Sequence, residues 1–164
     1  MWYNQRMKLY HGSNVIVRNP KILQSDRRLD FGTGFYLTSN YEQAARWAKL
    51  TVQRRGEGKE IVSVFDFDES AVNSLKVLKF EAANRNWLEY VTANRKNMTL
   101  QNDDYDIVIG PVANDRTMPV ISLYFSGIYD IEETIRRLLP QKLHDQYTFR
   151  TEKSLKALRF VEVR

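Results

Sequence analysis

Strand-like and helix-like segments are intermixed along this 164-residue chain, and their order constrains the fold more than any other feature of the sequence. Regular alternation of strand and helix would predict a doubly wound parallel sheet. The segments here do not form such repeating units, and no internal repeat, low-complexity stretch or linker divides the chain. We therefore predict a single α+β domain over residues 1–164, with largely antiparallel strand pairing.

The segments themselves are assigned from the period of their apolar residues, which is near two in strands and 3.6 in helices. A first strand is predicted to end at a turn formed by His11-Gly12-Ser13. The other predicted strands are 35–37, 61–67, 75–80, 105–109, one beginning at 145, and 160–163. The predicted helices are 41–54, 81–94, 130–139 and 152–158, and the first of them is stopped by Gly56 and Gly58.

Composition excludes several classes of protein. Hydrophobic residues make up 43 % and charged residues 27 % of the chain, which is typical of a compact globular domain. The absence of cysteine excludes disulfides, thiolate metal sites and a cysteine nucleophile, and two histidines without a spaced carboxylate pair give no metal-site pattern. No apolar run approaches the length of a membrane span and no secretory signal is apparent, so we expect no membrane partner and a cytoplasmic protein.

The net charge of +5 is modest, and the basic residues are scattered rather than gathered in a dense run with interleaved aromatics. This balance allows an anionic partner, such as a dinucleotide or a nucleic acid, but it is equally typical of a solvated basic surface. The sequence contains neither a P-loop nor a GxGxxG motif after a strand, so a Rossmann-type route to a dinucleotide is not supported.

Two motifs carry the functional argument. The first, LYHGS at residues 9–13, places an imidazole beside a glycine whose backbone a ligand can approach closely. The second, DFGTGFYLT at residues 30–38, places two glycines before an aromatic strand, and an alanine-rich helix carrying Trp47 follows. Tyr36 and Trp47 offer flat faces for a planar ring. Each motif alone is more typical of an ordinary turn or of core packing.

Together the two motifs resemble the nicotinamide pocket of the ADP-ribosyltransferase superfamily, in the diphtheria-toxin and poly(ADP-ribose) polymerase branch. The chain also resembles a bacterial family, catalogued as a domain of unknown function, whose members carry LYHGS, DFGxGFYLT and YDIVIGPVA. These stand at 9–13, 30–38 and 105–113 here, so the resemblance covers most of the chain. It implies an ADP-ribosyltransferase-like fold of split antiparallel β-sheets with flanking helices, and NAD as the co-substrate.

The resemblance also implies roles for individual residues. His11 would bind the adenosine-side ribose, Gly12 would clamp the nicotinamide carboxamide through its backbone, and Tyr36 would stack on the nicotinamide ring. Trp47 falls where the second stacking aromatic is expected, whereas Ala44 stands where the superfamily has a small hydroxyl. The predicted NAD-binding residues are Tyr10, His11, Gly12, Ser13, Gly34, Phe35, Tyr36, Ala44 and Trp47.

The third catalytic position departs from the superfamily. There, a glutamate near the start of a late strand binds the nicotinamide ribose and stabilises the positive charge that develops as the glycosidic bond breaks. In this chain Gln146 stands at that place, and its amide can accept a hydrogen bond but carries no charge. Glu152 and then Asp145 are the alternatives. The catalytic candidates are thus His11, Tyr36, Gln146 and Glu152.

Residues between and after the motifs are candidates for other parts of the substrates. Arg18, Arg27 and Arg28 lie where a loop could reach the pyrophosphate, although solvated arginines are the commoner finding in loops. The loops 19–30 and 94–104 are candidates for choosing the acceptor, because acceptor-choosing loops vary freely between relatives in this superfamily.

The leading functional hypothesis is a mono-ADP-ribosyltransferase that modifies a protein or nucleic-acid acceptor, as the toxin of a bacterial toxin–antitoxin pair whose antitoxin covers the cleft. The rivals are a non-catalytic NAD-binding module, which the glutamine at 146 favours, an NAD glycohydrolase with water as acceptor, and a transferase that modifies nucleic acid.

Overall fold

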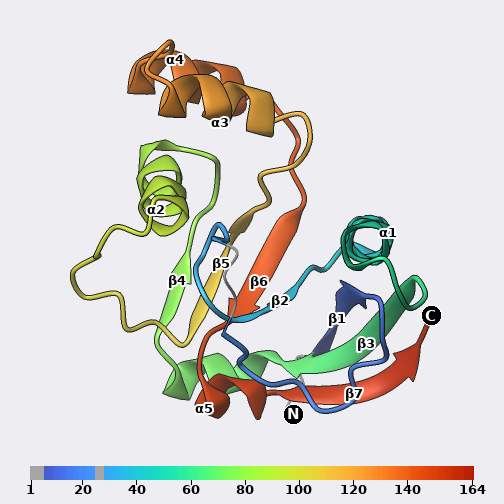
Figure 1. Cartoon of the computed structure of the whole chain (residues 1–164). Coiled ribbons are helices and arrows are strands. Elements are labelled where there is room, and N and C mark those ends of the chain that lie inside the picture. The colour runs from blue at the N-terminus through green and yellow to red at the C-terminus, as the bar shows by residue number, and fades with distance from the viewer. Residues whose placement is uncertain (1–5, 25–27) are drawn as a thin grey trace.

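A computed structural model describes residues 6–24 and 28–164. The chain forms two sheets that lie side by side, with helices on their outer sides (Figure 1). The strands are β1 (Arg6–Ser13), β2 (Phe35–Leu37), β3 (Ile61–Asp68), β4 (Val77–Lys79), β5 (Ile107–Pro111), β6 (Asp145–Phe149) and β7 (Leu158–Val163). The helices are α1 (Tyr41–Arg55), the 3-10 helix η1 (Glu69–Ser74), α2 (Arg85–Arg95), α3 (Met118–Phe125), α4 (Ile131–Leu138) and α5 (Glu152–Leu155).

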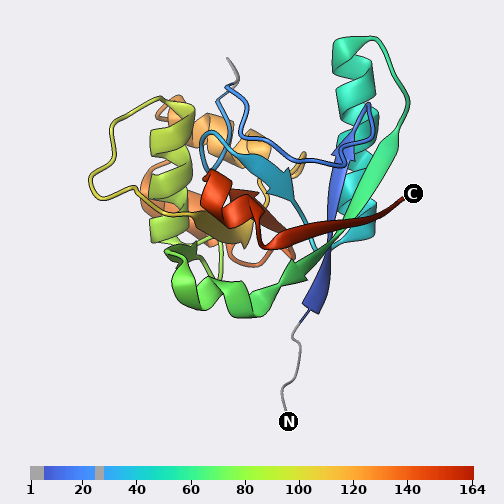
Figure 2. The same ribbon diagram turned by 90° about the horizontal axis from the view of Figure 1, so that it is seen from below.

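The first sheet has the order β1-β3-β7, and both of its pairings are antiparallel. Helix α1 lies along β1 and β3, which Figure 2 shows from below. The side chain of Asn40 begins this helix by accepting a hydrogen bond from the amide of Gln43, and Gly56 ends it in the left-handed conformation. These are the usual devices at the two ends of a helix, and they fix where α1 begins and ends.

The second sheet has the order β2-β6-β5-β4. Its β2/β6 and β5/β6 pairs are antiparallel, and β4/β5 is parallel. Helix α2 lies on the outer side of this sheet, and α3 and α4 lie beyond the end at which β6 begins (Figure 1). The three helices pack around the fully buried Trp87. The α+β class and the mainly antiparallel pairing predicted from the sequence are therefore confirmed.

The two sheets share one hydrophobic core and touch at one backbone bridge. Leu9 and Phe65 of the first sheet pack with Leu37, Ile107 and Phe149 of the second, and each of these five side chains is inaccessible to solvent. Beside this core, the backbone groups of residues 10 and 38 exchange two hydrogen bonds of 2.8 and 3.0 Å. The bridge fixes the middle of β1 against the start of the segment that leads from β2 into α1.

The predicted turn at His11-Gly12-Ser13 is wrong, because β1 continues through all three residues and pairs them with Ser63, Val62 and Ile61 of β3. The long partner strand supplies the backbone hydrogen bonds that keep this glycine-containing segment extended. Helix α3 has no counterpart among the sequence-based predictions. The helix expected over 152–158 ends at Leu155, and β7 begins at Leu158 after a short turn.

Candidate functional site

Two adjoining cavities lie where the sequence motifs meet. The first, of about 260 Å³, is lined by His11, Gly12, Tyr36, Trp47 and Gln146 together with residues of the flanking loops and helices. The second, of about 450 Å³, continues from His11, Gly12 and Tyr36 toward Ser13, Gly34 and Phe35. We refer to the two cavities together as the cleft. Five predicted site residues, separated by up to 135 positions in the sequence, thus line one cavity.

His11 is held as a neutral hydrogen-bond acceptor. Its Nδ1 lies 2.7 Å from the carbonyl oxygen of Tyr36, which can only accept, so Nδ1 carries the proton and Nε2 keeps its lone pair. Burial lowers the pKa of His11 from 6.5 to about 4, and the charge of Arg55 acts in the same direction against the raising effect of the backbone hydrogen bond. The ring also stacks on Phe35 at a centroid distance of 4.2 Å. Its orientation and tautomer are therefore set before any ligand binds.

Tyr36 is tied to the loop that precedes its own strand. Its hydroxyl donates to the carbonyl oxygen of Gly32 at 2.6 Å and accepts from the amide of Phe31 at 3.0 Å. Burial raises the pKa of this phenol above its ordinary value, and the nearby charge of Asp30 adds to the effect. Since the hydroxyl is engaged in the loop, the part of the side chain available to a ligand is the ring.

Gln146 is buried, with 3 % of its surface exposed, and belongs to a polar cluster at the floor of the cleft. Its Nε2 donates to Asp30 Oδ2 at 2.9 Å and to the carbonyl oxygen of Pro111 at 3.2 Å. Asp30, 5 % exposed, also forms an ion pair with Arg95, whose Nε donates to Oδ1 at 2.6 Å. Asp30 further accepts from the amide of Ala113 at 3.3 Å.

Two glycines of the motifs serve packing. A Cβ built on Gly12 would lie 1.9 Å from the carbonyl oxygen of Ala44 and 2.8 Å from the amide nitrogen of Ala48, so the space beside Gly12 is filled by α1. A Cβ on Gly34 would lie 2.8 Å from the carbonyl oxygen of Phe149 in β6. The sequence suggested that these glycines leave space for a ligand, but backbone atoms of α1 and β6 occupy the space where their side chains would be. The predicted backbone contact from Gly12 to a carboxamide stays a prediction.

Other predicted residues lie outside the cleft. Ala44 is fully buried between α1 and β3, and Tyr10 packs against the same cluster with its ring edge-on to Tyr41. Glu152 is exposed in the first turn of α5 and is not among the residues that line either cavity. Asp145 accepts hydrogen bonds from the amide and hydroxyl of Ser39, at 2.9 and 2.5 Å, so its carboxylate holds the turn before α1.

The cationic residues of the cleft differ from those singled out in the sequence. Arg54 and Arg95 line it, Arg55 lies at its second cavity, and none of the three belongs to a motif. Arg18 instead stacks its guanidinium over Phe160, 5.1 Å from the ring centroid, and Arg27 lies outside the described residues. Their place in the sequence could have indicated them, because Arg54 and Arg55 lie in the last turn of the helix that carries Trp47.

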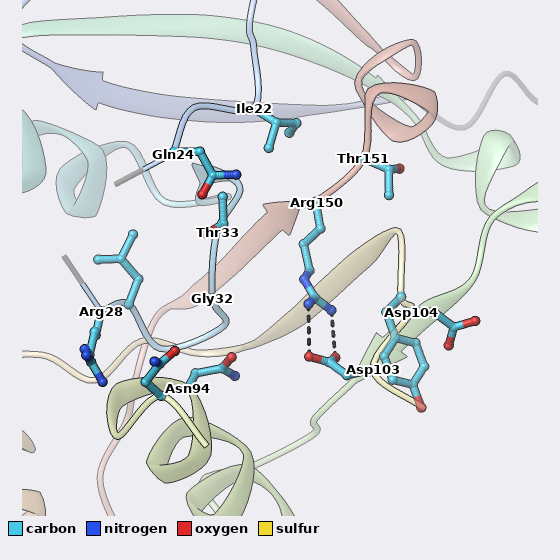
Figure 3. Close-up of a pocket in the computed structure, with 13 residues that line it drawn as sticks. Ile22, Gln24, Arg28, Gly32, Thr33, Asn94, Asp103, Asp104, Arg150 and Thr151 are labelled. Carbon is cyan, nitrogen blue, oxygen red and sulfur yellow. Dashed lines mark hydrogen bonds and ion pairs between the residues drawn. The ribbon is translucent and has the colours of Figure 1, made fainter. Parts of the chain in front are cut away.

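A further cavity of about 770 Å³ lies on the other side of the loop before β2 (Figure 3). Both loops predicted to choose the acceptor contribute to its lining, including Arg28, Asn94 and Asp103. Figure 3 shows the guanidinium of Arg150 facing the carboxylate of Asp103, at 2.8 and 3.0 Å. This ion pair fastens the 94–104 loop to the end of β6. The role of the two loops in acceptor choice stays a prediction.

Within residues 6–24 and 28–164, no three His, Asp or Glu side chains come together as metal ligands. None of the helices described in the structure has the length and apolar character needed to cross a membrane.

Besides Arg54 and Arg55, the sequence reasoning missed Asp30 and Arg95 as site residues. Asp30 belongs to the second motif, but nothing local indicates that its carboxylate would meet residues 65 and 116 positions away. One signal was available, because Asp30 directly precedes an aromatic residue. Phe31 is fully buried, and an acidic residue next to such a position needs a partner.

Comparison with known proteins places the chain in a family. No curated protein matches the chain. A family model described as "Protein of unknown function (DUF3990)" matches residues 7–160, a span that contains both motifs and every cleft residue discussed above. The chain is therefore a member of the DUF3990 family.

Proposed function

We propose that this protein is an NAD-dependent mono-ADP-ribosyltransferase. The observation that carries the proposal is the meeting of His11, Tyr36, Trp47 and Gln146 at one cavity. These residues come from β1, β2, α1 and β6, and the resemblance of the two motifs to the ADP-ribosyltransferase superfamily assigns each of them to NAD. A chance likeness of the motifs would not require these four residues to meet in space. Their meeting at one cavity therefore supports the assignment.

The chemistry available to these side chains fits the two halves of NAD. The neutral His11, with Nε2 as acceptor, suits a ribose hydroxyl, which can donate to it. Tyr36 and Trp47 contribute aromatic surface for the nicotinamide ring. The amide oxygen of Gln146 suits a hydroxyl of the second ribose. The bond between nicotinamide and ribose C1′ then breaks, neutral nicotinamide leaves with the bonding electrons, and an acceptor nucleophile bonds to C1′ and loses its proton.

We further propose that the protein acts in the cytoplasm as the toxin of a toxin–antitoxin pair, with an antitoxin protein that covers the cleft. This part of the proposal depends on the family resemblance, and the acceptor is a protein or a nucleic acid.

The test is a nicotinamide-release assay on the purified protein with NAD and cell lysate as a source of acceptors. His11→Ala and Tyr36→Ala are expected to abolish release, and Gln146→Ala to lower it strongly. Glu152→Ala tests the second candidate for the third position, because a fall in release with that variant would favour Glu152 over Gln146. Absence of release from the wild-type protein would rule out the enzyme.

One observation favours a second candidate, a non-catalytic NAD-binding module. Gln146 carries no charge, and an uncharged side chain stabilises a developing cation less than a carboxylate does. Calorimetric NAD binding without nicotinamide release would identify that case. Free ADP-ribose as the only product would identify an NAD glycohydrolase, and radioactive label on nucleic acid after incubation with labelled NAD would identify the acceptor.

A further inference from the structure

The polar cluster around Gln146 has an arrangement that fixes which end of the amide meets a ligand. Both N–H groups of Gln146 are directed at acceptors that cannot donate, the carboxylate of Asp30 and the carbonyl oxygen of Pro111. A flipped amide would place oxygen against oxygen at both contacts. The amide oxygen accepts no hydrogen bond from the described part of the protein, and Gln146 lines the cleft, so this oxygen is left for the ligand.

Asp30 is the only acidic side chain among the residues that line the 260 Å³ cavity, within the part of the chain that the structure describes. One carboxylate oxygen faces Arg95, and the other faces Gln146 and the amide of Ala113. These donors satisfy both oxygens of a side chain that is only 5 % exposed, as a buried acidic group requires. The acidic group of the site is therefore Asp30, which is joined to Gln146 by one hydrogen bond and does not stand at position 146 itself.

From this arrangement we propose that Asp30 is a positioning residue, which holds the Gln146 amide oxygen toward the bound ribose and supplies through that hydrogen bond the negative charge that Gln146 lacks. The inference deepens the proposed function and rests on it. Polarisation is the physical link, since an amide whose N–H donates to a carboxylate is a stronger acceptor at its oxygen. Glutamine at 146 and aspartate at 30 are thus a matched pair.

The matched pair makes a counter-intuitive result testable. Gln146→Glu would restore the residue type of the superfamily but would bring a second carboxylate to within about 3 Å of Asp30, where two like charges cannot both ionise. We therefore expect Gln146→Glu to lower kcat for nicotinamide release. Asp30→Asn removes the orienting charge and is expected to lower kcat by about 10- to 100-fold, as loss of an outer partner of a directly acting group does, with little change in KM.

The decisive protein is the double variant Asp30→Asn/Gln146→Glu, which exchanges the amide and the carboxylate across the same hydrogen bond. Its kcat is expected to exceed that of either single variant, because the amide introduced at position 30 can donate to the carboxylate introduced at position 146. The recovery should be partial, since the carbonyl oxygen of Pro111 then faces a carboxylate. Asp66→Asn is the matched control, because Asp66 is also a partly buried, arginine-paired carboxylate but lies on β3 away from the cleft. It should lower the melting temperature and leave kcat unchanged.

The outcomes separate the inference from the proposed function. Wild-type protein that releases no nicotinamide would overturn the function. Active wild-type protein would leave the function standing and overturn the inference if Asp30→Asn kept full kcat, or if the double variant were no better than its parents. The melting temperatures of the wild type, the two single variants and the double variant measure the coupling of residues 30 and 146 without activity, and additive shifts would also overturn the inference.

Discussion

His11 shows at the scale of one residue how burial prepares a site. The folded protein keeps this imidazole neutral, with a pKa of about 4, while an unfolded chain takes up a proton near 6.5. Between these values the unfolded state binds more protons, so stability is lost as the pH falls from 6.5 toward 4. The same burial that leaves Nε2 as an acceptor at neutral pH therefore makes the protein sensitive to acid.

Replacing His11 with glutamine should remove this part of the pH dependence. The fall in the free energy of unfolding between pH 7 and pH 4 should be smaller than in the wild-type protein by about 3 kcal/mol, the equivalent of the pKa difference. Urea titrations at the two pH values measure it, with His144→Gln, a change of an exposed histidine outside the cleft, as the control. Equal acid sensitivity of His11→Gln and wild type would contradict the assignment of a buried neutral imidazole.

The hydroxyl of Tyr36 stabilises the loop, whereas its ring is available to a ligand. Tyr36→Phe keeps the ring and deprives the amide of Phe31 and the carbonyl of Gly32 of their partner, so we expect a loss of about 1–3 kcal/mol in stability. Tyr10→Phe is the control, since the hydroxyl of Tyr10 has no hydrogen bond among the described residues. Denaturant titration of both variants checks the difference, and equal effects would show that the loop does not depend on this hydroxyl.

At this scale the sequence predicted fewer than half of the residues that line the cleft, chiefly those of the two motifs, because a short motif keeps its residues close in space. It could not choose among Gln146, Glu152 and Asp145, which lie within eight positions but face the cleft, solvent and the turn before α1 respectively. That choice depends on where β6 ends and α5 begins. Asp30 and Arg95 were missed because their contact joins residues 65 positions apart.

At the scale of elements, the contact of α1 with β1 depends on Gly12. Gly12→Ala would place a methyl group against the backbone of the helix, which cannot move away as a flexible side chain could. We expect a loss of about 3 kcal/mol or more, at or above the top of the usual range for overpacking, because the contact is with backbone. Gly56→Ala is the matched control, since the new Cβ would meet no atom within 4 Å. Only the left-handed backbone conformation would then cost stability, about 1 kcal/mol. Thermal denaturation distinguishes the two, and similar losses would mean that α1 adjusts.

Two of the errors at this scale have different causes. The turn predicted at His11-Gly12-Ser13 rested on glycine as a local signal, but pairing with β3 overrides that signal. Helix α3, with the sequence MPVISLYF, has no charged face and hence no helical periodicity to detect. Its apolar side chains pack partly against α4 and the outer helical cluster, so its helical state is decided by tertiary contacts.

For the whole molecule, the shared core implies that the two sheets unfold together. Leu9→Ala, in β1, should lower the free energy of unfolding by about 2–5 kcal/mol, as a large-to-small change in a core does. Trp47 and Trp87 belong to α1 and α2, which lie on opposite sides of the molecule, so tryptophan fluorescence reports on both sheets. Its transition should coincide with that of far-ultraviolet circular dichroism in wild type and variant. Separate transitions would show two independent folding units.

The connection between β1 and β2 is fastened at both of its ends. Near its start, Asn14 accepts from Arg55 at 2.9 Å and donates to the carbonyl oxygen of Glu57, and near its end Asp30 is held by Arg95. Between these anchors the amide of Val17 donates to the hydroxyl of Ser63 at 3.0 Å, and Val17 and Ile22 pack against the shared core. The consequence is that insertions are best tolerated after Ile22, where Leu23 is 69 % exposed, rather than earlier in the connection.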